Sequence, residues 1–157
     1  MYEAYMRKLI LKVVAHFLFI RPSNNHSYGD YEKLLTDNGI TIEQYANRAA
    51  DLPKNRQQLR HIIGIERWAW RRLMVCFGEP FIREEYDGYA PAADRSWPQL
   101  LADFKTTRQA TIALAQRFAR EQPANALVEH DDFGPMEAKV WLQYLCSHAE
   151  REVKSVR

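Results

Sequence analysis

Apolar residues recur at intervals of three and four along three long stretches of the chain, residues 54–77, 97–121 and 136–156. This spacing places them on one face of an α-helix, so each stretch is predicted to be an amphipathic helix. The period is strongest in the first stretch, where one arc carries Leu59, Ile62, Ile63, Glu66, Trp70 and Leu73.

Residues that start and stop helices lie at the ends of these stretches. Gly78 and a nearby proline end the first one, and Ser96, followed by a proline, is the expected N-cap of the second. Gly134 and the proline after it indicate the N-cap and first residue of the last helix. Between the first two helices, residues 79–96 hold glycine, proline and aromatic residues and are expected to form a long, packed loop.

The N-terminal run of residues 9–20 is apolar but is interrupted by Lys12 and His16. It is shorter than the roughly 20 apolar residues that a membrane-spanning helix needs. No small-residue cleavage site follows it, which argues against a signal peptide. We interpret it as a buried or partner-facing helix, with a strand or a membrane-surface helix as alternatives.

Residues 21–50 carry short, interrupted signals. A loop is expected over residues 21–29, and residues 30–38 are expected to be a helix that stops at Gly39. Thr41 would then begin a second short helix that ends near residue 50. One unbroken helix across Gly39 is the alternative. Asp51 is the expected N-cap of the helix that follows.

Neither a strand pair nor an internal repeat is evident. Three long helices and an N-terminal one therefore predict an all-α protein, a four-helix bundle forming a single domain over residues 1–157.

Composition narrows the class of protein. The 22 Lys and Arg residues nearly balance the 20 Asp and Glu residues, for a net charge of +2, so no nucleic-acid partner is expected. The chain has 2 cysteines, without CxxC spacing, which is typical of a cytoplasmic protein rather than of a disulfide scaffold. No membrane partner is expected.

Candidate chemistry lies on the last helix. His148 and Glu152 are four residues apart, and at about 100° per residue they share one stripe with Tyr144 and Trp141. Burying an imidazole and a carboxylate is costly unless the groups are paired or coordinated. A divalent metal would satisfy both, with zinc, iron and nickel all suited to such ligands. The simpler alternative is a His–Glu pair near a helix end.

The third partner is expected from the stretch 54–77. His61 is the candidate ligand, although a histidine at the rim of the bundle is an equally valid interpretation. Glu66 lies within the apolar arc, so it is expected to orient a ligand histidine, to bind the metal itself, or to pair with an arginine such as Arg60 or Arg83.

Two further groups of residues are weaker candidates for a functional site. The run from Glu129 through His130 to Asp132 resembles a ligand set, but a solvated acidic turn between helices is the expected interpretation. Cys146 projects about 160° away from His148 on the helix, so it should lie outside the site. No glycine-rich phosphate-binding loop is present in the sequence.

Three segments carry a resemblance to a known family. The chain resembles the DinB-like (damage-inducible) helical family over roughly residues 53–157. The resemblance is carried by RHIIGIERWAWRRL, by the helix start SWPQLLADF and by FGPMEAKVWLQYLCSHAERE. The first 50 residues match it poorly and are expected to supply an extra N-terminal helix.

The resemblance implies a bundle with an up-down-down-up course and a metal site of three histidines. Its first histidine falls on His61 and its second on His148, while its third position holds Glu152. The implied metal site is therefore His61, His148 and Glu152, with Glu66, Tyr144 and Trp141 around it. Some relatives are metal-dependent transferases that use low-molecular-weight thiols, so a small-molecule substrate is expected.

Three hypotheses remain open at the level of sequence. The first is a metal-binding DinB-like protein, a metal-dependent thiol transferase or a hydrolase. The second is a non-catalytic, stress-related binding protein with a degenerate metal site. The third is a homodimer formed through residues 1–20, which light scattering of a shortened chain would test. The residues themselves do not decide whether the protein is an enzyme.

Overall fold

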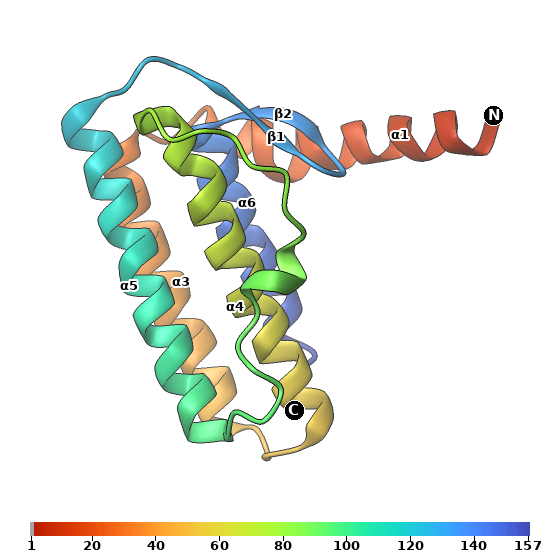
Figure 1. The fold of residues 1–157 in the computed structure, drawn as a ribbon, viewed down its shortest axis with the longest axis vertical. Coiled ribbons are helices and arrows are strands. Elements are labelled where there is room, and N and C mark those ends of the chain that lie inside the picture. Colours follow the sequence, from red (N-terminus) through yellow and green to blue (C-terminus); the bar gives the residue numbers. More distant parts are fainter. Residues whose placement is uncertain (1) are drawn as a thin grey trace.

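In the computed structural model, the backbone is described for residues 2–157 and side chains for residue 6 and residues 9–157. The chain is mostly helical (Figure 1). Its N-terminal part comprises α1 (Tyr2–Ala15), a π-helical turn η1 (His16–Ile20), α2 (Arg21–Ser23) and α3 (Tyr28–Arg48). The remainder comprises α4 (Pro53–Leu73), the 3-10 turns η2 (Met74–Phe77) and η3 (Tyr86–Tyr89), α5 (Trp97–Glu121), β1 (Leu127–His130), β2 (Gly134–Glu137) and α6 (Ala138–Val153).

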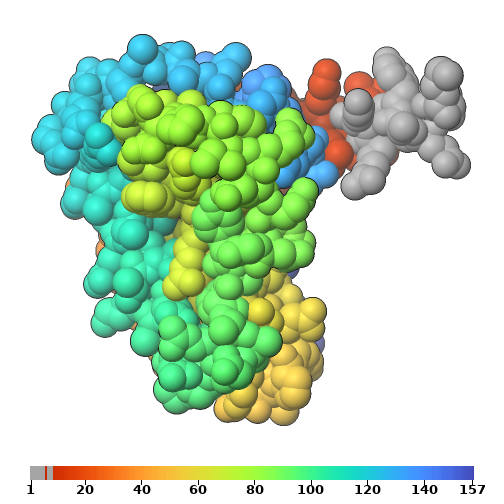
Figure 2. Space-filling view, in the orientation of Figure 1, coloured from red at the N-terminus to blue at the C-terminus, as the bar shows by residue number. Residues whose placement is uncertain are grey.

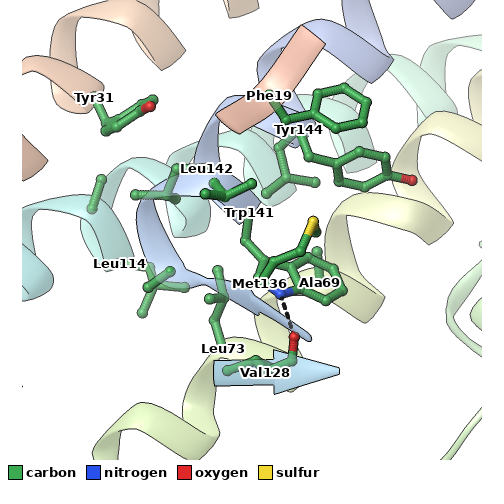
Figure 3. Packing of buried hydrophobic residues seen from close by; sticks show 14 of the residues in the cluster. Phe19, Tyr31, Ala69, Leu73, Leu114, Val128, Met136, Trp141, Leu142 and Tyr144 are labelled. Carbon is green, nitrogen blue, oxygen red and sulfur yellow. Dashed lines mark hydrogen bonds between the residues drawn. The ribbon is translucent and has the colours of Figure 1, made fainter. Parts of the chain in front are cut away.

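The long helices α3, α4, α5 and α6 pack side by side, as Figure 1 shows. Helix α3 contacts α5 and α6, and α4 contacts the same two helices from the other side. Helices α4, α5 and α6 are the three that the apolar period predicts. Their apolar faces meet in the core shown in Figure 3, where Trp141 and Leu142 of α6 lie near Ala69 and Leu73 of α4.

Helix α3 is unbroken, so the predicted stop at Gly39 is wrong and the continuous alternative is correct. Gly39 is buried inside the helix, and a Cβ added there would lie 3.0 Å from Cγ of Arg108. The glycine therefore allows α5 to approach closely, although glycine costs roughly 1 kcal/mol in a helix interior.

Two of the predicted helix ends are confirmed. Gly78 ends the α4–η2 segment with a φ of 92°, and Ser96 caps α5 together with Gln99. At the start of α4, however, the N-cap is Leu52 rather than Asp51. The carboxylate of Asp51 instead pairs with Arg56 in the first turn of α4.

A β-hairpin lies where the sequence suggested no strand pair. Strands β1 and β2 are antiparallel, with Val128 opposite Met136, and α6 begins at Ala138 rather than at the predicted Gly134–Pro135. The indole Nε1 of Trp141 donates a hydrogen bond to the carbonyl of Val128 at 3.0 Å, which ties the hairpin to α6 (Figure 3). Gly134, with a φ of 75°, serves the turn and does not cap the helix.

The segment of residues 79–96 lies along α4 (Figure 2), and its turn η3 packs against that helix, although most of the segment is exposed. Trp68 Nε1 donates a hydrogen bond to the carbonyl of Glu84 at 2.8 Å. The segment approaches α4 most closely at Gly64, where an added Cβ would lie 3.2 Å from three atoms of Ala90. This packing forms one wall of the site described below.

Helix α1 projects away from the four long helices (Figure 1). The side chains of Ile10 and Phe17 are both 57% exposed, whereas Phe19 is fully buried against Tyr144 and Phe133. The N-terminal run is therefore mostly exposed, with Ala15 and Phe19 buried, and a partner on its exposed side stays a prediction. The homodimer stays a prediction.

Across the described residues, every helix is too short or too polar to cross a membrane.

Candidate functional site

A cavity of about 400 Å³ opens between α4, α6, the hairpin and the 79–96 segment. Histidines from three of these elements line it, together with aromatic and charged side chains. The lining residues are His61, Ile65, Trp68, Glu85, Tyr86, His130, Asp131, Asp132, Phe133, Tyr144, His148 and Arg151.

His61 and His148 meet across this cavity from different helices. Their ring centroids are 5.2 Å apart, and Tyr86 packs edge-on against His61 at 5.3 Å. Two imidazoles bound to one tetrahedral zinc ion at bonds of about 2.0–2.1 Å would have their centroids roughly 5 Å apart. The separation of this pair therefore fits a shared divalent cation.

The electrostatic setting keeps His148 neutral at pH 7. Burial, together with the smaller effects of nearby His61 and Arg151, lowers its pKa to about 3. Its Nδ1 is buried and has no hydrogen-bond partner among the described residues. A neutral imidazole offers a lone pair to a metal or to a hydrogen-bond donor, so His148 is in the form that a binding site needs.

Glu152 does not line this cavity. Its carboxylate Oε2 accepts a hydrogen bond from Nε2 of Gln58 on α4 at 2.5 Å. Among the described side chains, no group of three or more His, Cys, Asp or Glu residues is arranged to hold a metal ion. The structure thus brings together two of the three predicted ligands, and the third is held by an amide next to the site.

Glu66 has a structural partner that the sequence did not indicate. It is 1% exposed and binds Arg108 of α5, whose Nη2 donates to Oε2 at 2.9 Å. Neither Arg60 nor Arg83 is its partner, and Glu66 does not line the cavity. The idea that Glu66 binds a metal or orients a ligand histidine is therefore replaced by a buried ion pair between α4 and α5.

His130 is the residue that sequence reasoning placed wrongly. It is 5% exposed, not part of a solvated turn, and its ring contacts Trp68, Trp141 and Tyr144. Its Nδ1 accepts a hydrogen bond from the backbone N–H of Asp132 at 3.1 Å. The acidic neighbours hid this burial, and only an alternating apolar pattern on either side of the turn could have revealed it.

Tyr144 and Trp141 differ in their relation to the cavity. Tyr144 lines it, with its ring 5.5 Å from that of His148, and burial raises the pKa of its hydroxyl well above the usual value. Trp141 is fully buried in the apolar core shown in Figure 3 and does not line the cavity. Cys146 lines a different cavity, between α3 and α6, as its helical position predicts.

Burial of His130 makes stability depend on pH. Its pKa is lowered to about 4, chiefly by desolvation, from an ordinary value of 6.5. The unfolded chain then binds the proton more tightly, so the contribution is fully present above pH 6.5 and is lost as pH falls towards 4. We expect a loss on the order of 3 kcal/mol in the free energy of unfolding.

Urea unfolding of wild type and His130→Asn at about pH 7 and pH 4 measures this contribution. Asparagine keeps an acceptor for the backbone N–H of Asp132 but does not titrate, so its stability should fall less across this range. Equal losses in both proteins would contradict the assignment.

Comparison with protein families identified one match. A sequence model of the DinB superfamily matches residues 29–153, which span α3 to the end of α6. Comparison with curated proteins and with solved structures gave no significant match.

Proposed function

Since the chain belongs to the DinB superfamily, we propose that it binds a divalent metal ion through His61 and His148. The bound ion would act on a small molecule held in the cavity that these two histidines line. The observation that carries the proposal is the His61–His148 pair, 5.2 Å apart at the cavity wall. The proposal includes the up-down-down-up course of the family for α3, α4, α5 and α6, and a cytoplasmic location.

We propose Glu152 as the third ligand. It lies on the same helical face as His148, one turn further along α6, and its present partner is the neutral amide of Gln58. Two imidazoles and one carboxylate suit zinc, iron or nickel.

A bound cation would supply Lewis acidity and would lower the pKa of a thiol or water, as a thiol transferase or a hydrolase requires. The residues of the chain provide the surroundings. The rings of Tyr86 and Tyr144 pack against His61 and His148, respectively. The hydroxyl of Tyr144 keeps its proton at neutral pH, so it can donate a hydrogen bond to the ligand.

A metal-free binding protein is the second candidate. It is favoured by the Gln58–Glu152 hydrogen bond and by the two-histidine set, because three protein ligands are usual for a catalytic zinc site. In this case the two imidazoles would contact the ligand directly by hydrogen bonds.

Calorimetric titration of zinc into chelator-treated protein separates the two candidates. We expect one ion per chain in the wild type and binding about tenfold or more weaker in His61→Ala and in His148→Ala. His26→Ala is the matched control, because His26 lines the separate cavity between α3 and α6. Absence of zinc binding, or equal weakening in the control, would favour the metal-free candidate.

A further inference from the structure

A second cavity, of about 510 Å³, adjoins the histidine cavity. His61 and Tyr86 line both cavities, so the edge-on contact between these two rings separates one cavity from the other. The first turns of α4 and the turn η3 form the remaining walls. The residues that line this second cavity are Lys54, Gln57, Gln58, Arg60, His61, Tyr86, Asp87 and Ala90.

Arg60 brings an uncompensated charge to this second cavity. Its guanidinium is partly buried, and its Nε donates to the carbonyl of Pro91 at 2.7 Å, which fixes the group in place. Within the described part of the chain, no carboxylate forms an ion pair with it. Arg67 and Arg72 of the same helix each pair with an aspartate. A partly buried charge without a counter-ion is costly, and an anion from outside would offset that cost.

Two further hydrogen-bond donors in the second cavity also favour an anionic ligand. Lys54 and Gln57 line the second cavity and make no side-chain hydrogen bond or ion pair with the described residues. Asp87 is the single carboxylate among the lining residues, and it pairs with neither Lys54 nor Arg60. An ammonium, a guanidinium and a primary amide together offer donors that match the oxygens of a carboxylate.

We propose that the second cavity binds the carboxylate of a small-molecule ligand whose other end enters the histidine cavity. The shared wall of His61 and Tyr86 makes one elongated site from the two cavities. The inference rests on the proposed function only in the claim that the far end of the ligand reaches the histidine pair. The carboxylate contacts themselves need no metal.

The test uses metal-free protein, dialysed free of chelator, with succinate as the probe and its neutral diamide, succinamide, as the comparison. Nuclear magnetic resonance follows the side-chain signals of Gln57, Gln58 and Arg60. We expect saturable shifts with succinate and none with succinamide. Arg60→Gln should weaken succinate binding about tenfold or more, and Arg60→Lys, which keeps the charge, should recover part of it.

Arg83→Gln is the matched control, because Arg83 is an exposed arginine of the 79–96 segment that lines neither cavity. It should leave succinate binding unchanged. Equal binding of succinamide, equal losses in the two arginine variants, or binding of inorganic phosphate without succinate would overturn the proposal. Since no metal is present, failure of this test is distinct from failure of zinc binding.

Discussion

Replacing Arg108 with methionine should lower the free energy of unfolding by about 3–5 kcal/mol, because it leaves the carboxylate of Glu66 buried without a counter-charge. The side chains of Arg108 and Glu66 are 3% and 2% exposed. Besides its hydrogen bond to Glu66, Arg108 donates from Nη1 to Oδ1 of Asn38 at 2.8 Å and to the carbonyl of Leu35 at 3.2 Å. One guanidinium thus joins α3, α4 and α5.

The matched control is Arg120→Met, on the same helix. Arg120 forms an exposed ion pair with Glu121, and such pairs contribute about 0–1 kcal/mol. The double variant Glu66→Leu/Arg108→Met should recover part of the loss, because neither charge is then left unpaired. Urea denaturation of the four proteins measures these differences. A loss in Arg108→Met no larger than in Arg120→Met would contradict the structural role of the pair.

The Glu152→His variant should bind zinc at least as tightly as the wild type, and the Glu152→Ala variant should bind it about tenfold or more weakly. Histidines four residues apart project from one face of α6, which is the arrangement in which two imidazoles share an ion. The alanine variant removes both a ligand and a negative charge that would offset the cation. Calorimetric zinc titration of the three proteins measures these affinities.

Glu150→His is the control for the added imidazole. Glu150 lies on α6 but lines the cavity between α3 and α6, away from the histidine pair. This variant should bind zinc as the wild type does. If the wild type and Glu152→Ala bind zinc equally and weakly, Glu152 is not a metal ligand and its role is confined to the hydrogen bond with Gln58.

The parts of the fold that were predictable are those fixed by local chemistry. The apolar period of α4, α5 and α6 and the caps at Ser96 and Gly78 follow from residues close in sequence. The predicted break at Gly39 is wrong because Gly39 faces Arg108 of α5, a contact between residues far apart in the sequence. The hairpin was missed because each of its strands has only 4 residues, too few for a clear alternating pattern.

In the candidate site, too, features fixed by the local sequence were predictable and contacts between helices were not. The apolar stripe of the last helix indicated His148, the stretch 54–77 offered His61, and the family resemblance implied both; the structure brings their rings together. The partner of Glu66 on α5 and the partner of Glu152 on α4 depend on how the helices are arranged. Spacing along one helix indicates which side chains share a face but not which groups of a neighbouring helix bind them.

Metal content of the protein purified without chelator tests the central claim most directly. We predict close to one divalent ion per chain in the wild type, measured by inductively coupled plasma mass spectrometry, and close to none when His61 and His148 are both replaced by alanine. A wild-type protein that contains no more zinc, nickel or iron than the double variant, even after incubation with each metal, would contradict the account.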